Sequence, residues 1–346
     1  MRPFLAALAL AACAPAAPAQ WQPQALATDA DLRGLSAVSP KVAWVSGTKG
    51  TFGRTTDGGA TWAVGTVPGA ADLDFRDVKA FGAGTAYLLS AGAGKGSRIT
   101  KTADGGQSWQ LQFTSGEPEA FFDALAFWDE THGIALSDPV GGRFRLVATD
   151  DGATWTPLPE ASRPAALPGE GCFAASGTCL VARGDQDVWF CTGGAKVARV
   201  FHSGDRGKTW AVVETPLAAG IASAGGFSIA FRDRDRGVVV GGDYRKPDAT
   251  AGTAAWTGDG GKTWTRAEKP PAFRSAVAWA GGEWVAVGTS GTDASADGGA
   301  TWRPLDAGAY NSVAFTAAGD GWAVGPKGRV AKFAPPPPRR PPPPPQ

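Results

Sequence analysis

The segment Thr257–Trp264 reads TGDGGKTW, and five other segments of the chain repeat its pattern, Ser/Thr-x-Asp-x-Gly-x-Thr-Trp, or a close variant. The other copies are Thr55–Trp62 (TTDGGATW), Thr102–Trp109 (TADGGQSW), Ala148–Trp155 (ATDDGATW), Ser203–Trp210 (SGDRGKTW) and Ser295–Trp302 (SADGGATW). Their closing tryptophans are 38 to 55 residues apart. Repetition at this spacing is typical of proteins built from one small structural unit. The spacing is sufficient for a sheet of four short strands.

Each copy has the chemistry of a tight turn between two strands. An Asp carboxylate accepts hydrogen bonds from nearby backbone N–H groups, and Gly supplies the positive φ that such a turn needs. The closing Thr-Trp pair favours the start of a strand. The phrase resembles the Asp-box, or bacterial neuraminidase repeat. We therefore expect its aspartates to be structural: Asp57, Asp104, Asp150, Asp205, Asp259 and Asp297.

Short apolar runs with period-two patterning surround the boxes and predict an all-β chain. The runs expected to form first strands are Leu32–Val38, Phe75–Phe81, Phe121–Phe127, Phe273–Trp279 and Tyr310–Phe315. The last repeat, Tyr310–Phe333, has three strands and no box, but Trp21–Leu26 (WQPQAL) matches the fourth-strand pattern. The prediction is therefore a single seven-bladed β-propeller in which residues 21–27 complete the last blade and shield its open edge.

The two ends of the chain differ in composition from the repeats. Residues 1–19 have the pattern of an export signal, with Arg2, an apolar run and small residues before Gln20. Leu10–Cys13 also resembles a lipobox, so cleavage near Gln20 and lipidation at Cys13 remain alternatives. Residues 20–333 are assigned to the propeller, and the proline-rich residues 334–346 are expected to be disordered. We expect a periplasmic or extracellular protein that reaches a membrane only through a lipid anchor.

Three cysteines fall in one stretch of the fourth repeat, Cys172, Cys179 and Cys191. In an oxidising compartment, one disulfide and one remaining thiol are expected. Cys172–Cys179 would close a short loop and is the preferred pair. A Cys179–Cys191 bridge between adjacent strands and three reduced, buried thiols are the alternatives.

Loops that depart from the repeat template gather at the end of the propeller away from the boxes. There, Arg33, Arg76 and Arg274 follow the first apolar residue of their strands and are expected to face the channel mouth together. With Arg245 and Lys246 they would form a cationic mouth, with Tyr244 and Phe122 as an apolar floor. Such a mouth favours an anionic partner. The alternative is that each Arg pairs with a neighbouring carboxylate, such as Asp77 or Asp243, and is structural.

No cofactor and no metal site are expected from the residue pattern. His132 and His202, the only histidines, fall at the box end and away from the mouth. A net charge of +1 gives no general argument for nucleic acid. Because some Asp-box propellers are sialidases or other glycoside hydrolases, an alternative is hydrolysis by carboxylates of the mouth. The candidates are Asp138, Glu170 and Asp243.

The boxes, the seven short blades, the Trp-Ala-Val-Gly second strand at Trp322–Gly325 and the signal peptide resemble the bacterial relatives of photosystem II stability and assembly factors. The resemblance covers about residues 24–333. It implies a non-catalytic platform that binds a partner protein, although a shared fold does not determine function. We therefore expect a monomer whose partner is a protein or an acidic peptide, with a glycan or a small anion as alternatives.

Overall fold

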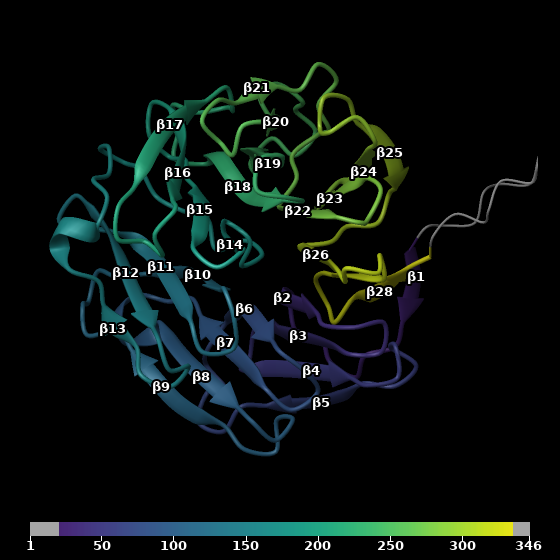
Figure 1. Cartoon of the computed structure of the whole chain (residues 1–346). Coiled ribbons are helices and arrows are strands. Elements are labelled where there is room, and N and C mark those ends of the chain that lie inside the picture. The colour runs from purple at the N-terminus through teal and green to yellow at the C-terminus, as the bar shows by residue number, and fades with distance from the viewer. Residues whose placement is uncertain (1–20, 335–346) are drawn as a thin grey trace, which may run out of the picture.

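The computed structural model of the chain describes residues 21–334, which form a ring of small sheets around a central axis (Figure 1). The export signal, the lipobox at Cys13 and the proline-rich residues 335–346 lie outside the described residues and stay predictions. Within residues 21–334, the helices are two single 3-10 turns, η1 (Gly94–Gly96) and η2 (Glu160–Ser162). None of the helices described is long and apolar enough to cross a membrane.

The strands form seven antiparallel sheets of four strands, which confirms the predicted seven-bladed propeller. Blades one to three are β2 (Leu32–Ala37), β3 (Ala43–Gly47), β4 (Thr51–Thr55) and β5 (Ala63–Thr66); β6 (Phe75–Ala80), β7 (Ala86–Ser90), β8 (Arg98–Thr102) and β9 (Gln110–Thr114); and β10 (Phe122–Phe127), β11 (Gly133–Val140), β12 (Arg143–Thr149) and β13 (Thr156–Pro157). Blades four and five are β14 (Leu180–Arg183), β15 (Asp187–Cys191), β16 (Ala198–Ser203) and β17 (Ala211–Thr215); and β18 (Ala224–Phe231), β19 (Gly237–Asp243), β20 (Ala254–Thr257) and β21 (Thr265–Arg266). Blades six and seven are β22 (Ala276–Trp279), β23 (Trp284–Gly288), β24 (Gly291–Ser295) and β25 (Arg303–Asp306); and β26 (Ser312–Phe315), β27 (Gly321–Val324), β28 (Val330–Phe333) and β1 (Trp21–Gln24).

The N-terminal strand closes the ring, as the sequence predicts. β1 pairs with β28 in antiparallel register, with Trp21 opposite Phe333 and Gln24 opposite Val330. The Trp21 side chain is 2% exposed and packs against Tyr310 and Phe315 of the same blade. Gln24 reaches the first blade, where its Oε1 accepts a hydrogen bond from the box tryptophan Trp62. The first described strand therefore joins the last blade to the first.

The box aspartates fasten the turns between third and fourth strands. In the first box, Asp57 Oδ1 accepts the Thr61 N–H at 2.9 Å and the Thr55 hydroxyl at 2.8 Å. The Thr61 hydroxyl donates to Asp57 Oδ2 at 2.5 Å, and Thr55 Oγ1 accepts the N–H of Gly59 at 2.8 Å. The hydrogen bonds from Thr61 hold the pKa of Asp57 at about 2. The expected structural role is therefore met by direct contacts in this box.

The third box differs from the prediction, because Asp151 and not Asp150 takes the structural role. Thr149 donates its hydroxyl to Asp151 Oδ1 at 3.0 Å, and the same oxygen accepts the Thr154 N–H at 2.7 Å. Asp150 is exposed, and its side chain makes no hydrogen bond within residues 21–334. The cause is a turn shorter by one residue, in which Gly152 follows the box aspartate directly and still donates to Thr149 Oγ1.

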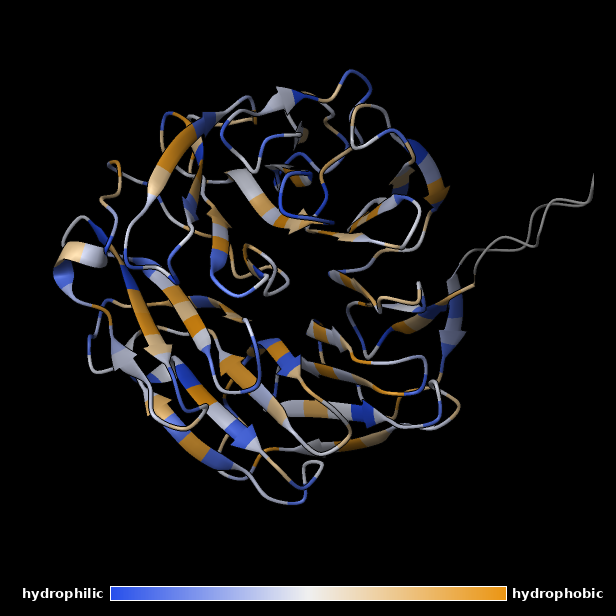
Figure 2. Ribbon diagram, in the orientation of Figure 1, coloured by the Kyte–Doolittle hydropathy of each residue, from blue (hydrophilic) through white to orange (hydrophobic). Residues whose placement is uncertain are grey.

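The largest side chains buried between blades lie on second strands. Trp44, Trp189, Trp284 and Trp322 are at most 1% exposed. Their indoles also link elements, since Trp44 Nε1 donates to Gly82 O in the second blade and Trp189 Nε1 donates to Gly260 O in a box of the fifth. The strands alternate between hydrophobic and hydrophilic residues along much of the ring (Figure 2). The core is therefore distributed between neighbouring sheets, as six separate clusters within the described part of the chain.

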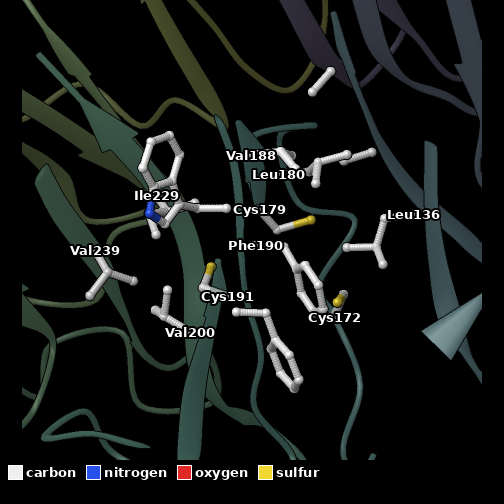
Figure 3. Packing of buried hydrophobic residues seen from close by; sticks show 14 of the residues in the cluster. Leu136, Cys172, Cys179, Leu180, Val188, Phe190, Cys191, Val200, Ile229 and Val239 are labelled. Atoms are coloured by element: carbon white, nitrogen blue, oxygen red, sulfur yellow. The ribbon is translucent and has the colours of Figure 1, made fainter. Parts of the chain in front are cut away.

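The predicted Cys172–Cys179 disulfide is absent from the described residues, where Cys172, Cys179 and Cys191 are free and buried. All three belong to the core cluster between blades three, four and five, with Leu136 and Phe190 among their neighbours (Figure 3). A buried thiol packs as a small apolar side chain and needs no bridge.

Candidate functional site

A short segment ahead of β14, residues 173–178, crosses the central channel; we call it the plug. In Figure 1 the chain before β14 reaches toward the middle of the ring. Backbone oxygens of the plug accept hydrogen bonds from inner strands of three other blades. These are Arg33 Nη1 to Ala175 O at 3.2 Å, Arg76 Nη1 to Ala174 O at 3.3 Å, Lys79 Nζ to Gly177 O at 3.3 Å and Ser312 Oγ to Ser176 O at 3.4 Å. The plug also donates from Ser176 Oγ to Ser275 O at 2.9 Å, in the sixth blade.

The two ends of the plug line different cavities. Thr178 lines a cavity of about 350 Å³ on the box side, whose walls are the ends of the inner strands. Residues 173–175 line a second cavity of about 430 Å³ at the opposite end, where the inner strands begin. We call the second cavity the mouth pocket. Its wall is Arg33, Arg76, Phe121, Asp123, Asp138, Cys172, Phe173, Ala174, Ala175, Phe227, Tyr244, Phe273, Ser275, Thr289 and Asn311.

A β-bulge at the start of the inner strands aims one residue of each affected blade at the mouth pocket. The register between first and second strands shifts around Arg33, Arg76, Asp123 and Phe227 in blades one, two, three and five. Bulges leave one residue unpaired and re-aim its side chain. All four residues line the pocket. Sequence reasoning missed Asp123 and Phe227. Asp123 follows the first residue of β10, as Arg33 and Arg76 follow theirs, and this place was the available signal. Phe227 is the fourth residue of β18 and carries no such signal.

Two of the predicted mouth residues lie elsewhere. Arg274 is 4% exposed, and its guanidinium pairs with Asp293 of β24, with Nε at 2.6 Å from Oδ2. Phe122 of the third blade is 2% exposed and packs against Phe113 of β9 in the second blade, with ring centroids 5.3 Å apart. Both errors have one cause, a one-residue misalignment of the repeats. Ser275 in the sixth blade and Asp123 in the third reach the pocket at the places assigned to Arg274 and Phe122.

Arg33 and Arg76 do line the mouth pocket, and each is also paired with a carboxylate. Arg33 Nη2 lies 2.9 Å from Asp31 Oδ2, and Arg76 Nε lies 2.7 Å from Asp74 Oδ2. Their side chains are 26% and 32% exposed. Ion pairs with this solvent access contribute about 0–1 kcal/mol. A guanidinium that turned toward a ligand would also give up the hydrogen bond that it donates to the plug. Asn311 shares the arrangement, because its Nδ2 donates to Asp31 Oδ1 at 2.6 Å.

The wall opposite the two arginines is aromatic. Phe173 of the plug stacks on Phe227 with centroids 3.8 Å apart, and Phe273 and Tyr244 pack edge-on against Phe227. Tyr244 lines the pocket as predicted and is 47% exposed. Arg245 and Lys246 follow it on the exposed β19–β20 loop, with the Arg245 guanidinium 5.9 Å from the Tyr244 ring centroid. These two cations are therefore at the rim and outside the wall.

The three carboxylates considered for hydrolysis do not converge. Glu170 is 6% exposed and held in a buried pair by Arg199, whose Nε lies 2.8 Å from Oε1, and by the Thr192 hydroxyl at 2.6 Å. Asp243 caps its own loop, where its Oδ1 accepts the Arg245 N–H at 3.0 Å. Asp138 alone lines the mouth pocket. Glu170 and Asp243 thus have structural contacts that explain them.

Asp138 has a second carboxylate beside it, which the sequence analysis did not single out. Asp123 is 1% exposed, and neither of its carboxylate oxygens has a hydrogen-bond partner among the described residues. Burial, and then the charge of Asp138, raise the pKa of Asp123 well above its usual range. Burial also raises the pKa of Asp138 to about 6, opposed by the Cys172 N–H that donates to it at 2.8 Å.

Both histidines have partners outside the mouth pocket. His132 Nδ1 lies 2.8 Å from Asp129 Oδ2 in an exposed turn. His202 Nε2 lies 2.8 Å from Asp187 Oδ1, and its ring stacks on Trp189. Their placement agrees with the expectation that neither serves the mouth.

The chain resembles photosystem II assembly factors in sequence and in fold. A family model described as photosynthesis system II assembly factor YCF48 matches residues 14–111. Photosystem II assembly protein Ycf48 of Synechococcus sp. (strain JA-2-3B'a(2-13)) is 26% identical over 283 residues, which is 68% of this chain and 74% of that protein. Ycf48 of Synechococcus sp. (strain JA-3-3Ab) is 30% identical over 197 residues, 56% of this chain and 48% of that protein.

Solved structures show the same likeness in the fold. A structure of YCF48 bound to D1 peptide superposes with a TM-score of 0.64 at 17% identity, over 94% of this chain and 99% of that one. YCF48 from Cyanidioschyzon merolae gives a TM-score of 0.63 at 19% identity, over 92% and 99%. The chain is thus an all-β propeller like those of the photosystem II assembly factors.

Proposed function

We propose that this chain is an exported, non-catalytic scaffold that binds an anionic segment of a partner protein in the mouth pocket. The observation that carries the proposal is the convergence of Arg33 and Arg76, from separate blades, on one cavity of about 430 Å³ with an aromatic opposite wall. Guanidinium groups recognise carboxylates through charge-assisted hydrogen bonds. The aromatic side suits the apolar side chain of an extended peptide.

The relatives support a polypeptide ligand over a small molecule. Two of them are named photosystem II assembly proteins, and one structural neighbour was solved with a D1 peptide. Arg245 and Lys246 at the rim add positive charge along the path of an approaching acidic segment.

The test is a binding titration with labelled peptides, each made with a free C-terminal carboxylate and again as the amide. The D1 peptide of the structural neighbour is one of the panel. We expect fluorescence anisotropy to show binding of the acid forms, weakened at least about tenfold in the Arg33→Gln, Arg76→Gln double variant because two charge-assisted contacts are removed.

The control is Arg236→Gln, which removes an exposed cation at the β18–β19 connection, at the box end of the ring. Its binding curves should match those of the unchanged protein. Equal binding of acid and amide forms, or full binding by the double variant with an unchanged melting temperature, would refute an anion site at the arginines.

A further inference from the structure

Three potential metal ligands meet at the third-blade side of the mouth pocket. They are the carboxylates of Asp123 and Asp138 and the thiol of Cys172, with one ligand atom from each lying within 4.8 Å of the others. β10 supplies Asp123, β11 supplies Asp138, and the chain leading into the plug supplies Cys172. All three line the same cavity. One ion at ordinary metal–ligand distances could contact all three atoms after small side-chain movements.

Two β-bulges and one backbone hydrogen bond bring these side chains together. Asp123 is the bulged residue between β10 and β11, and Asp138 is the bulged residue between β11 and β12. The Cys172 N–H holds Asp138 Oδ1 at 2.8 Å, which brings the thiol and this carboxylate together. Two bulges, one in the β10–β11 pair and one in the β11–β12 pair, thus turn two aspartates to the same side.

The buried carboxylate of Asp123 is a second, independent observation that points to a ligand at this corner. Its side chain is 1% exposed, and both carboxylate oxygens lack partners within the described residues. Buried polar groups in folded proteins are nearly always satisfied, and buried charges are paired or coordinate a metal. The nearby cation Arg76 does not fill the role, because its hydrogen bonds go to Asp74 Oδ2 and Ala174 O.

We propose that Asp123, Asp138 and Cys172 bind a Zn²⁺-class divalent ion, with a further coordination position open toward the mouth pocket. A thiolate ligand favours zinc and related transition ions over Mg²⁺ and Ca²⁺, which prefer oxygen ligands throughout. A site with three protein ligands leaves one position for water or an incoming group. This site is separate from the peptide contacts of Arg33 and Arg76 and does not depend on the proposed peptide function.

The test uses the full chain, kept reduced so that Cys172 and Cys179 cannot be joined by oxidation. Cobalt(II) is the probe, because a bound thiolate gives it an intense ligand-to-metal absorption band. We expect one equivalent of Co²⁺ to bind with this band, and excess Zn²⁺ to abolish it. Mg²⁺ in the same excess should leave the band unchanged.

Three variants separate this site from adventitious thiol binding. Cys172→Ser should lose the band, and Asp123→Asn should keep it with affinity lowered at least about tenfold. Cys191→Ser, which removes a buried thiol outside the three-residue cluster, should behave as the unchanged protein. Loss of the band in Cys191→Ser, with the band retained in Cys172→Ser, would overturn the assignment.

A second measurement needs no variant and so does not depend on their folding. X-ray absorption of the unchanged chain loaded with one equivalent of Zn²⁺ should show one sulfur neighbour at about 2.3 Å and oxygen neighbours at about 2.0–2.2 Å. A first shell without sulfur, or with two sulfurs, contradicts the proposed ligands. Absence of any one-equivalent binding contradicts the site itself, while leaving peptide binding at the arginines to its own test.

Discussion

Arg76 and Asp123 occupy the same bulge position in neighbouring blades, and each is the residue through which its inner strand faces the mouth pocket. The repeat therefore places a guanidinium and a carboxyl group at equivalent positions of one rim. Burial and Asp138 raise the pKa of Asp123, and the positive charge of Arg76 opposes them. Because the bulge is set by the backbone, the residue at this position can change from blade to blade without altering the fold. The bulge position holds Arg33, Arg76, Asp123 and Phe227 in blades one, two, three and five.

The shortened third box gives a prediction with its own control. Asp151→Ala should lower the melting temperature, because Asp151 holds the Thr149 hydroxyl and the backbone N–H of Thr154. Asp150→Ala changes the adjacent aspartate, which is exposed, and should leave the melting temperature unchanged. Thermal unfolding followed by circular dichroism compares the two. Equal effects of the two substitutions would show that the turn is not fastened through Asp151.

The box carboxylates also predict how stability depends on acid. Hydrogen bonds from the box hydroxyl and N–H groups hold the pKa values of Asp57 and Asp104 at about 2, below the value of about 3.9 for an unfolded Asp. The unfolded chain then binds more protons, so this stabilisation is present above pH of about 4 and is lost as the pH falls to about 2.

Asp138 acts with the opposite sign, at a higher pH. Burial raises its pKa to about 6, so its contribution to stability increases as the pH falls from about 6 to about 4.

Urea unfolding between pH 7 and pH 2 tests the box aspartates. Because their stabilisation is lost in acid, the free energy of unfolding should fall steeply below about pH 4. A constant free energy of unfolding between about pH 4 and pH 2 would contradict the inferred role of the boxes.

The number of blades and the closure of the ring could be predicted because both depend on patterns that repeat. Six boxes set the spacing of the blades, and Trp21 shares its place with the tryptophans that begin other fourth strands. The register of β1 against β28 confirms the closure. Strand alternation is a local property, so it could be interpreted without knowledge of the rest of the molecule.

The mouth was predicted only in part, because bulges and long-range contacts leave weak local signals. Phe75-Arg76 and Phe273-Arg274 are the same dipeptide, yet Arg76 lines the pocket and Arg274 is buried against Asp293. A shift of one residue reverses the face that a strand residue presents. The spacing of the boxes does not mark the plug, because Trp155 and Trp210 are 55 residues apart and Trp210 and Trp264 are 54 apart. Its contacts with the other blades depend on the closed ring.

Closure of the ring predicts a large loss of stability when Trp21 is truncated. Trp21→Ala removes a side chain that is 2% exposed and packed against Tyr310, Phe315 and Phe333. We expect the free energy of unfolding to fall by about 3–5 kcal/mol, the range for buried Trp to Ala. Gln22→Ala, at an exposed position of the same strand, should change it by less than about 0.5 kcal/mol. Similar urea midpoints for the two variants would mean that β1 does not stabilise the last blade.

The plug depends on a glycine that can be tested against a matched glycine elsewhere. Gly177 has φ +66°, and a Cβ added there would lie 2.2 Å from Cγ of Asp77, a residue that is fully buried. Gly184 has φ +60° with open space around it. Gly184→Ala should therefore cost only the conformational penalty of about 1–2 kcal/mol. Gly177→Ala should cost clearly more in urea unfolding, because Asp77 or the plug must move. If both substitutions lower the free energy of unfolding equally, the plug can shift to accommodate the added Cβ without moving Asp77 of the second blade.

The three buried cysteines give a direct check on the free thiols that replace the predicted disulfide. Burial raises the pKa values of the Cys172 and Cys191 thiols well above their usual range, and the thiol form reacts slowly with disulfide reagents. In a Cys13→Ser variant, a colorimetric thiol reagent should therefore react negligibly with the native protein. In guanidinium chloride it should detect all three thiols, Cys172, Cys179 and Cys191. A count of one after unfolding would mean that two of them are bridged. Mass mapping of the bridge would then separate Cys172–Cys179 from Cys179–Cys191.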